Sequence, residues 1–310
     1  MYTNEKPLVL SVSVVLATRN RGDHVVECVE TILANSGFVD LIVVDQSDGD
    51  ETEKALGRIE DQRLRYVRTA TRGVTNGRNL GIELSQSDII AFTDDDCRVA
   101  PDWVSSFTRV FETDEDVSVV CGRVRVPDEL RSLGFAESFE PVIREWRGRF
   151  PPFGQDWGIT ANLAMRRAVV ARVGKFDPML GAGAPLRSGE EPDFLFRVLR
   201  EGLKVVNASE VVVAHLGVRA HGVESQKLIR GYGSGTGAAL FKHVRLGDRE
   251  ALAVYLGFVG ANLERVWKRA RQGRRPDGLG YLLAFVSGSL TAYRYQVDAT
   301  RRQYVQRRAR

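Results

Sequence analysis

Apolar, β-branched runs recur along the first 130 residues, and this pattern constrains the fold most strongly. Four runs are typical of buried strands, at residues 8–18, 40–45, 88–94 and 117–126. Segments with apolar residues at helical spacing lie between them, as at residues 21–35. Strands that alternate with helices in this way predict an α/β fold, with a mostly parallel sheet and helices on both of its faces.

Polar side chains end three of the predicted strands. Thr18, Asp45 and Asp94 each stand at the carboxyl end of a run. In open parallel sheets, ligands bind beyond the carboxyl ends of the strands. We therefore expect these three side chains to lie along one rim of the sheet, next to a binding site.

Three consecutive carboxylates, Asp94, Asp95 and Asp96, close the run at 88–94. A polar loop after a strand would explain them without any function. Hard divalent cations, however, bind several oxygen ligands, commonly one or two carboxylates together with substrate phosphates. Asp94 and Asp96, as alternate residues, can project toward one ligand if the chain turns after the strand. Their position at the predicted rim favours a metal or substrate site.

The second half of the chain is less regular. A glycine-rich loop at 179–191 leads into a predicted helix at 192–202, and a later β-branched strand ends at His215. From residue 223 the pattern is helical. Two apolar segments there, 251–263 and 279–293, fall short of the roughly 20 residues that span a bilayer. They predict helices that lie at a membrane surface, pack on the rest of the chain, or pair with a second subunit.

Composition limits the class of protein. The chain has 310 residues, of which 43% are hydrophobic and 27% are charged, as in an ordinary globular protein. Its three cysteines match no metal or disulfide spacing, and the polar start "MYTNEKP" resembles no signal peptide, so we expect a cytoplasmic protein. Residues 264–310 carry a net charge of +9 and the remainder −5, which favours an anionic partner for the tail. No nucleic-acid-binding signature accompanies this charge, so we expect no nucleic acid.

Five motifs follow one another along the chain: "ATRNR", "VVDQSDGD", "TNGRN", "TDDD" and "GEEPDF". From about residue 10 to 216 this order resembles the family-2 glycosyltransferases. The resemblance implies a GT-A fold and inverting transfer of a sugar, of the hexosyltransferase type, from a nucleotide-diphosphate sugar. We accordingly expect a catalytic domain at 8–222, with a nucleotide-sugar half at 8–126 and an acceptor half at 127–222. A helical extension would follow at 223–310.

The resemblance assigns substrate-binding roles to residues in the first half. It places nucleotide and diphosphate contacts at Thr18, Arg19, Asn20, Asp45, Asp48, Arg78, Asn79, Asp94 and Asp95. Two positions depart from the usual family pattern: Gln46 follows the first aspartate, and Gly77 stands where an alanine is common. Metal ligation is implied for Asp96 and Asp94, with Mn²⁺ or Mg²⁺ as the ion. His215 would complete the shell, since imidazole suits Mn²⁺.

The catalytic base is implied in "GEEPDF". Family members often have an aspartate where this chain has Glu191, and Glu190 and Asp193 remain rivals. Without function, the same acids would be a cluster favoured by the dipole at a helix start. The segment "DWGITANLAMRR" resembles the acceptor side, where Trp157 would stack on a sugar, or equally belong to the core, and Asn162 would form a hydrogen bond.

Two rival classes stay open. A nucleotidyltransferase that makes a nucleotide sugar would also use Asp94 and Asp96, but it would show a glycine-rich basic loop after the first strand, which "LATRNRGD" lacks. A non-catalytic scaffold of the same fold at a membrane surface would not need an intact set of acids. The expected role is in polysaccharide or glycan biosynthesis. The sugar, the nucleotide, the acceptor (glycan, lipid-linked or small molecule) and the oligomeric state are not determined by the sequence.

Overall fold

A nine-stranded sheet forms the core of the structure, a computed structural model that describes residues 10–142, 144–150, 157–273 and 278–305. Every residue of its strand β1 (Val12–Thr18) is buried, so both faces of the sheet are covered. The other strands of this sheet are β2 (Asp40–Asp45), β3 (Leu64–Arg68), β4 (Ile89–Asp94), β5 (Cys97–Val99), β6 (Val117–Arg125), β8 (Glu145–Arg147), β9 (Leu163–Arg166) and β10 (Lys204–His215).

The strand order is β3-β2-β1-β4-β9-β6-β10-β5, with β8 paired to β10. Strands β3, β2, β1 and β4 are parallel neighbours, and β6 and β10 share their direction because β9 runs antiparallel to both β4 and β6. Only β9, β5 and β8 oppose this direction among the described strands of the sheet. The predicted α/β fold with a mostly parallel sheet is therefore confirmed.

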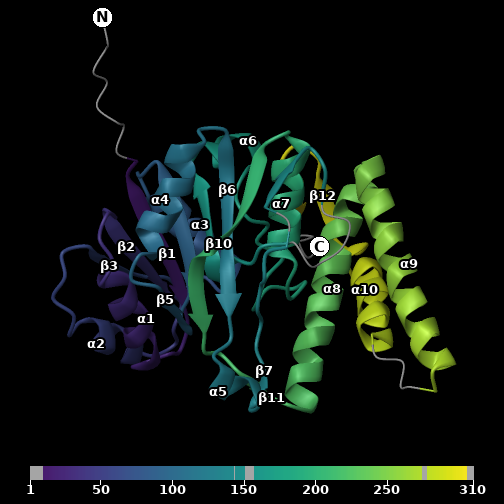
Figure 1. Cartoon of the computed structure of the whole chain (residues 1–310), viewed down its shortest axis with the longest axis horizontal. Coiled ribbons are helices and arrows are strands. Elements are labelled where there is room, and N and C mark those ends of the chain that lie inside the picture. Colours follow the sequence, from purple (N-terminus) through teal and green to yellow (C-terminus); the bar gives the residue numbers. More distant parts are fainter. Residues whose placement is uncertain (1–9, 143, 151–156, 274–277, 306–310) are drawn as a thin grey trace, which may run out of the picture.

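Helices follow the strands and cover the sheet (Figure 1). Their amphipathic faces bury apolar side chains, as α4 does with Trp103, Phe107 and Phe111. The helices that belong to the sheet region are α1 (His24–Leu33), α2 (Glu51–Leu56), α3 (Val74–Leu84), α4 (Trp103–Thr113), α5 (Asp128–Arg131), α6 (Ala168–Val173) and α7 (Glu190–Arg200), with a 3₁₀ turn at Thr160–Asn162.

Three long helices follow the sheet region: α8 (Val223–Arg245), α9 (Arg249–Arg271) and α10 (Leu279–Ala292). They stand side by side at one end of the molecule, opposite the end that holds β2 and β3 (Figure 1). Glycines bring α8 and α10 close together: a Cβ at Gly237 would overlap the backbone of Phe285, and one at Gly288 would overlap Ser234. Close packing thus explains part of the glycine pattern in "GYGSGTG". In the described part of the chain, no helix is both long and apolar enough to cross a membrane.

Local boundaries differ from the prediction in several places. The strand expected to end at His215 does so, but it begins as early as Lys204: β10 is one strand whose register shifts between Ala208 and Val212. A β-bulge of this kind keeps one strand continuous across a break in the apolar pattern. The short strands were not predicted, because two or three residues carry no periodic signal. They are β5 and β8 in the main sheet, the pair β7 (Gly134–Phe135) and β11 (Arg219–Ala220), and the pair β12 (Gln296–Asp298) and β13 (Gln303–Val305).

Candidate active site

The carboxyl ends of β1, β2 and β4 meet at one rim, as the sequence predicts. Thr18 pairs with Asp45 across β1 and β2, and Ala17 pairs with Asp94 across β1 and β4. A cavity of about 1490 Å³ opens at this rim. Its lining includes Thr18 and all three consecutive aspartates, whereas Asp45 lies beneath it.

The three aspartates have different sets of partners, although Asp95 and Asp96 share Arg21. Asp94 accepts a hydrogen bond from the buried Arg78 at 2.6 Å. Asp95 accepts one from the Thr18 hydroxyl at 2.7 Å and pairs with Arg21 at 3.0 Å. Burial raises the pKa of Asp95 despite the nearby Arg21 charge. The triplet is therefore not a solvated loop, since its charges are held by specific cations at the edge of the cavity.

Asp96 joins the first half of the chain to the second. It lies 3.1 Å from Arg21 and 3.2 Å from His215 Nε2. Burial would lower the pKa of His215, but the hydrogen bond and charge of Asp96 raise it to about 9. His215 Nδ1 donates to the backbone carbonyl of Glu137 at 2.8 Å, which fixes the orientation of the ring.

A divalent metal fits beside Asp96 and His215. Ligand atoms of Asp96, His215 and Cys97 lie within 4.8 Å of one another. Carboxylate oxygen and imidazole nitrogen suit Mn²⁺, whereas burial raises the pKa of Cys97 and keeps its thiol protonated. Gly217 leaves space next to the pair, because a Cβ there would overlap Asp96 Oδ2 and come within 3.0 Å of His215 Nε2. These donors and this space support Asp96 and His215, two of the three predicted ligands. The third, Asp94, is not part of this group of ligand atoms and pairs with Arg78 instead.

Glu190 and Glu191 begin α7 and face the same cavity. Arg78 lies 3.2 Å from Glu190 and 3.9 Å from Glu191, and so links both acids to Asp94. Burial and the neighbouring Glu191 raise the pKa of Glu190 to about 8, and its buried Oε2 has no hydrogen-bond partner among the described residues. Glu191 instead accepts a 2.6 Å hydrogen bond from the Thr160 hydroxyl. The two neighbouring glutamates thus have different environments.

Asp193, the third candidate base, does not line the cavity. It is fully buried one turn further along α7, within 3.1 Å of Arg197, Lys242 and His243. Burial would raise the pKa of Asp193, but the charges of Lys242 and Arg197 hold it well below its usual range. Asp193 joins α7 to α8 and has no path to a substrate proton.

Three other residues expected to bind substrate serve the fold. The buried Asp45 accepts hydrogen bonds from Ser47 and from the Tyr66 hydroxyl. Asn79 exchanges two hydrogen bonds with the backbone of Phe176, because the residue after Arg78 on α3 points about 100° away around the helix. Asn162 is fully buried and bonds Trp103 and two backbone carbonyls. The reason in each case is that side-chain direction depends on packing, which spacing alone does not report.

The remaining predicted residues lie at or near the mouth of the cavity. Arg19 and Asn20 line it, and both bond the exposed Asp48, which stands just outside the lining. Trp157 also lines the cavity, but it is only 8% exposed and packs on Phe150 with ring centroids 4.8 Å apart, as part of the hydrophobic core.

The two departures from the family pattern touch each other. A Cβ at Gly77 would come within 2.9 Å of the Ala17 Cβ and 3.2 Å of the Gln46 side chain. Gln46 in turn donates to the carbonyls of Thr71 and Gly73. The glycine therefore leaves space that the side chains of Ala17 and Gln46 occupy.

Sequence reasoning missed several residues that line the cavity. Arg21 was within reach, because a cation three residues after Thr18 complements the three aspartates. Glu137 and Tyr232 gave no motif; the Tyr232 hydroxyl donates to Glu137 at 3.0 Å, and burial together with Glu191 raises the pKa of Glu137 to about 7. Three further cations on the lining form no ion pair in the described residues: Arg187, Arg219 and Lys227.

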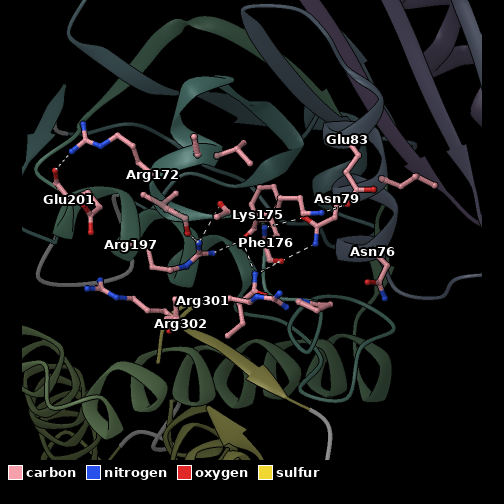
Figure 2. A pocket seen from close by; sticks show the side chains of 18 of the residues that line it. Asn76, Asn79, Glu83, Arg172, Lys175, Phe176, Arg197, Glu201, Arg301 and Arg302 are labelled. Atoms are coloured by element: carbon pink, nitrogen blue, oxygen red, sulfur yellow. Dashed lines mark hydrogen bonds and ion pairs between the residues drawn. The ribbon is translucent and has the colours of Figure 1, made fainter. Parts of the chain in front are cut away.

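A second cavity, of about 970 Å³, lies on the outer side of α3 against the hairpin β12–β13. Figure 2 shows Asn79, Glu83, Arg172, Lys175 and Arg301 around it. Asn79 is the only member of the predicted site that lines it, and Lys175 is already paired with Glu83. The three consecutive aspartates and the two glutamates of α7 line the first cavity and not the second.

Comparison with known proteins agrees with this geometry. The family model described as "Glycosyl transferase family 2" matches residues 13–174, just over half of the chain. The chain therefore belongs to the family-2 glycosyltransferases, which confirms the resemblance read from its motifs.

Individual relatives and solved structures are also similar to the chain. Over 184 residues it is 28% identical to the glucosyl-dolichyl phosphate glucuronosyltransferase of Haloferax volcanii, an alignment that covers 56% of this chain and 58% of the relative. The chain thus spans little more than half of that relative's length. The fold is similar to that of mannosyltransferase PcManGT from Pyrobaculum calidifontis, solved in complex with GDP-Man and Mn²⁺. The TM-score is 0.61 and the identity 17%, over 90% of this chain and 86% of that one. It is also similar to that of GalNAc-T7 with UDP, GalNAc and Mn²⁺, with a TM-score of 0.57 and 14% identity over 92% of this chain and 55% of that one.

Proposed function

We propose that this protein transfers a sugar from a nucleotide-diphosphate sugar to an acceptor hydroxyl, with inversion at the anomeric carbon. It is proposed to be of the hexosyltransferase type. The observation that carries the proposal is the contact of Arg78 with both Asp94 and Glu190. This contact brings the acids after β4 and the acids of α7 to one cavity, although the two motifs lie far apart in the sequence.

The donor occupies the rim in this proposal. Thr18, Arg19 and Asn20 line the end of the cavity nearest to β1, where the nucleoside would lie. The diphosphate would lie beside Asp94 and Asp96, with its charge balanced by cations on the lining that lack an ion pair in the described residues, namely Arg187, Arg219 and Lys227. The half 8–126 would then hold most of the donor, while the half 127–222 would face the acceptor and would also reach the diphosphate through Arg187 and Arg219.

Asp96 and His215 are the proposed ligands of Mn²⁺ or Mg²⁺, with Asp94 at the ribose or at a metal-bound water. When bound, the ion would neutralise the negative charge that develops on the leaving diphosphate. The complexes of the two similar folds with Mn²⁺ support this choice of ion. His215 is oriented for this role by its hydrogen bond to the Glu137 carbonyl.

Glu191 is the proposed general base. With a pKa of about 8, Glu190 is protonated at neutral pH and cannot accept a proton there. Glu191, held by Thr160, remains available to take the proton of the acceptor hydroxyl as the oxygen attacks. Glu190 then acts as a neutral neighbour that avoids a second negative charge beside the base.

The acceptor would enter along the opposite wall. Apolar and aromatic side chains line this wall, including Trp157, Ile159, Phe258 and Tyr281. Such a wall suits a sugar face or the apolar part of a lipid-linked acceptor. The name of the Haloferax relative, a glucosyl-dolichyl phosphate glucuronosyltransferase, supports a lipid-linked acceptor. We further propose that the protein is cytoplasmic and works in glycan biosynthesis.

A screen of nucleotide sugars tests the function without knowledge of the acceptor. We expect hydrolysis of one donor to depend on Mn²⁺ or Mg²⁺ and to release a nucleoside diphosphate. Asp96→Ala should abolish it. Release of pyrophosphate from a sugar phosphate and a nucleoside triphosphate would instead identify a nucleotidyltransferase, and activity that persists in Asp96→Ala would reject the proposed metal site.

A further inference from the structure

The outer faces of α9 and α10 carry unusually exposed apolar side chains. On α9 they recur at helical spacing, and so they do on α10. The exposed positions on α9 are Leu252, Leu256, Leu263 and Trp267. Those on α10 are Leu279, Leu283, Val286 and Leu290, and Tyr293 follows directly after its last residue. Monomeric proteins rarely expose apolar patches larger than a few hundred Å² unless the patch binds something.

These faces are uncharged over most of their length. No charged residue occurs between residues 251 and 263 or between 279 and 293. The inner faces already have partners: Phe258 stacks on Phe285 at 4.3 Å and lies 5.8 Å from the Tyr281 ring. The exposed residues are therefore a second, separate apolar surface on helices whose own core is complete.

Basic residues and aromatic rings surround this surface. Trp267 lies beneath the guanidinium of Arg271 at 4.5 Å, and Tyr293 beneath that of Arg245 at 5.3 Å. Further cations stand at the end of α9, at Arg265, Lys268 and Arg269. Tryptophan and tyrosine near arginines are typical of the boundary between lipid headgroups and acyl chains.

We propose that the outer faces of α9 and α10 dock on the surface of an anionic lipid bilayer. Charge distinguishes this occupant from a second copy of the chain. Arg245 and Arg271 lie against rings of this surface, and Lys268 and Arg269 stand in the last turn of α9, so two copies joined here would bring like charges together, whereas an anionic bilayer attracts these cations. The uncharged segments are too short to cross the bilayer and long enough to lie in its surface.

Docking in this orientation has a consequence for the cavity. Phe258 and Tyr281 belong to the same two helices, but they line the catalytic cavity on the inner side. A surface-bound protein would thus hold its acceptor wall close to the lipid. This consequence rests on the proposed function, whereas the docking itself does not.

Sedimentation with vesicles tests the docking independently of any activity. The full chain is mixed with vesicles of phosphatidylcholine, alone or with phosphatidylglycerol, at low salt and at about 1 M salt, where screening removes most surface attraction. We expect binding to the anionic vesicles at low salt. The double variant Leu256→Glu/Leu283→Glu should reduce this binding at least about tenfold, because it removes apolar contact and adds repulsion.

The control variant is Val39→Glu, which places the same charge on a similarly exposed apolar residue before β2. Val39 is 59% exposed, as is Leu256, and Leu283 is 61% exposed, so all three changes should leave the fold intact. Val39→Glu should bind vesicles like the unchanged protein. Absence of binding by the unchanged protein, or equal binding by the double variant, overturns the proposal. So does sedimentation velocity that finds a dimer which the double variant dissociates, without vesicle binding, because a second copy would then cover this surface.

Discussion

Two regions line one cavity but are built in different ways: the strand rim at the carboxyl ends of β1 and β4, and a helical wall formed by residues of α8, α9 and α10. At the rim, Thr18 and Asp94 reach the cavity because they end parallel strands, so local sequence determines their place. In the wall, Tyr232 and Tyr281 reach it only because α8 and α10 pack against the sheet region and each other. The position of a strand-end residue in the site can thus be predicted from local sequence, whereas the position of a residue in the helical wall depends on tertiary packing.

The largest expected effect belongs to the rim. Asp96→Ala should lower transfer by at least about 10³-fold, since metal stabilisation of a leaving group contributes several kcal/mol. Steady-state rates at saturating Mn²⁺ measure this effect, with thermal unfolding to show that the fold is retained. A small loss of rate would show that Asp96 does not bind the catalytic metal, and would contradict the assignment of the metal site to the end of β4.

A stability effect should single out the helical wall. Asp193→Asn removes the charge that faces Lys242 and Arg197 in a buried cluster, and breaking such a pair costs about 3–5 kcal/mol. The measurement is the free energy of unfolding in denaturant. The control, Asp48→Asn, alters an exposed carboxylate whose ion pair is screened by solvent, and should change this free energy far less than Asp193→Asn does.

The same cluster predicts a pH dependence. Because the folded pKa of Asp193 lies below the unfolded value of about 3.9, its contribution to stability is complete above that pH and is lost as the pH falls through the folded pKa. The difference in unfolding free energy between the unchanged protein and Asp193→Asn should therefore narrow below about pH 4. A difference that grows with acid would contradict the cluster.

A smaller effect is expected at the metal pair. Gly217→Ala places a Cβ against Asp96 and His215, and should raise the metal concentration for half-maximal activity about 10–100-fold, as other changes around metal ligands do. Gly231→Ala is the matched control, because Gly231 also lines the cavity and its Cβ would meet nothing within 4 Å. An equal metal dependence in the two variants would contradict the proposal that the metal binds between Asp96 and His215.

The smallest effect tests whether the wall takes part at all. Tyr232→Phe removes the hydroxyl that donates to Glu137, and should lower kcat/KM for the acceptor by up to about tenfold, the worth of one hydrogen bond. Tyr255→Phe, which removes a hydrogen bond to Ser289 between α9 and α10, should leave kcat/KM unchanged. If neither variant affects the acceptor, the helices are only a support for the sheet.

Much of the fold and the core of the site could be predicted from the sequence. Buried β-branched runs define β1, β2, β4 and β6, and their polar ends define the rim. Asn79, Asn162 and Asp193 could not be placed in this way, because neighbouring positions on a helix or turn point in different directions and only packing decides which one faces the cavity. Glu137 lies on an irregular segment whose contact with His215 and Tyr232 depends on residues about 80 to 95 positions away.

The central claim is that one glutamate of α7 takes the acceptor proton while its neighbour remains neutral. The most direct test compares Glu191→Gln with Glu190→Gln in single-turnover transfer, with donor affinity measured separately. Glu191→Gln should keep donor affinity and lose the rate by roughly 10²–10⁴-fold, whereas Glu190→Gln should lose less than about tenfold, because an amide resembles a protonated carboxyl. A large loss in Glu190→Gln together with a near-normal rate in Glu191→Gln would contradict the account.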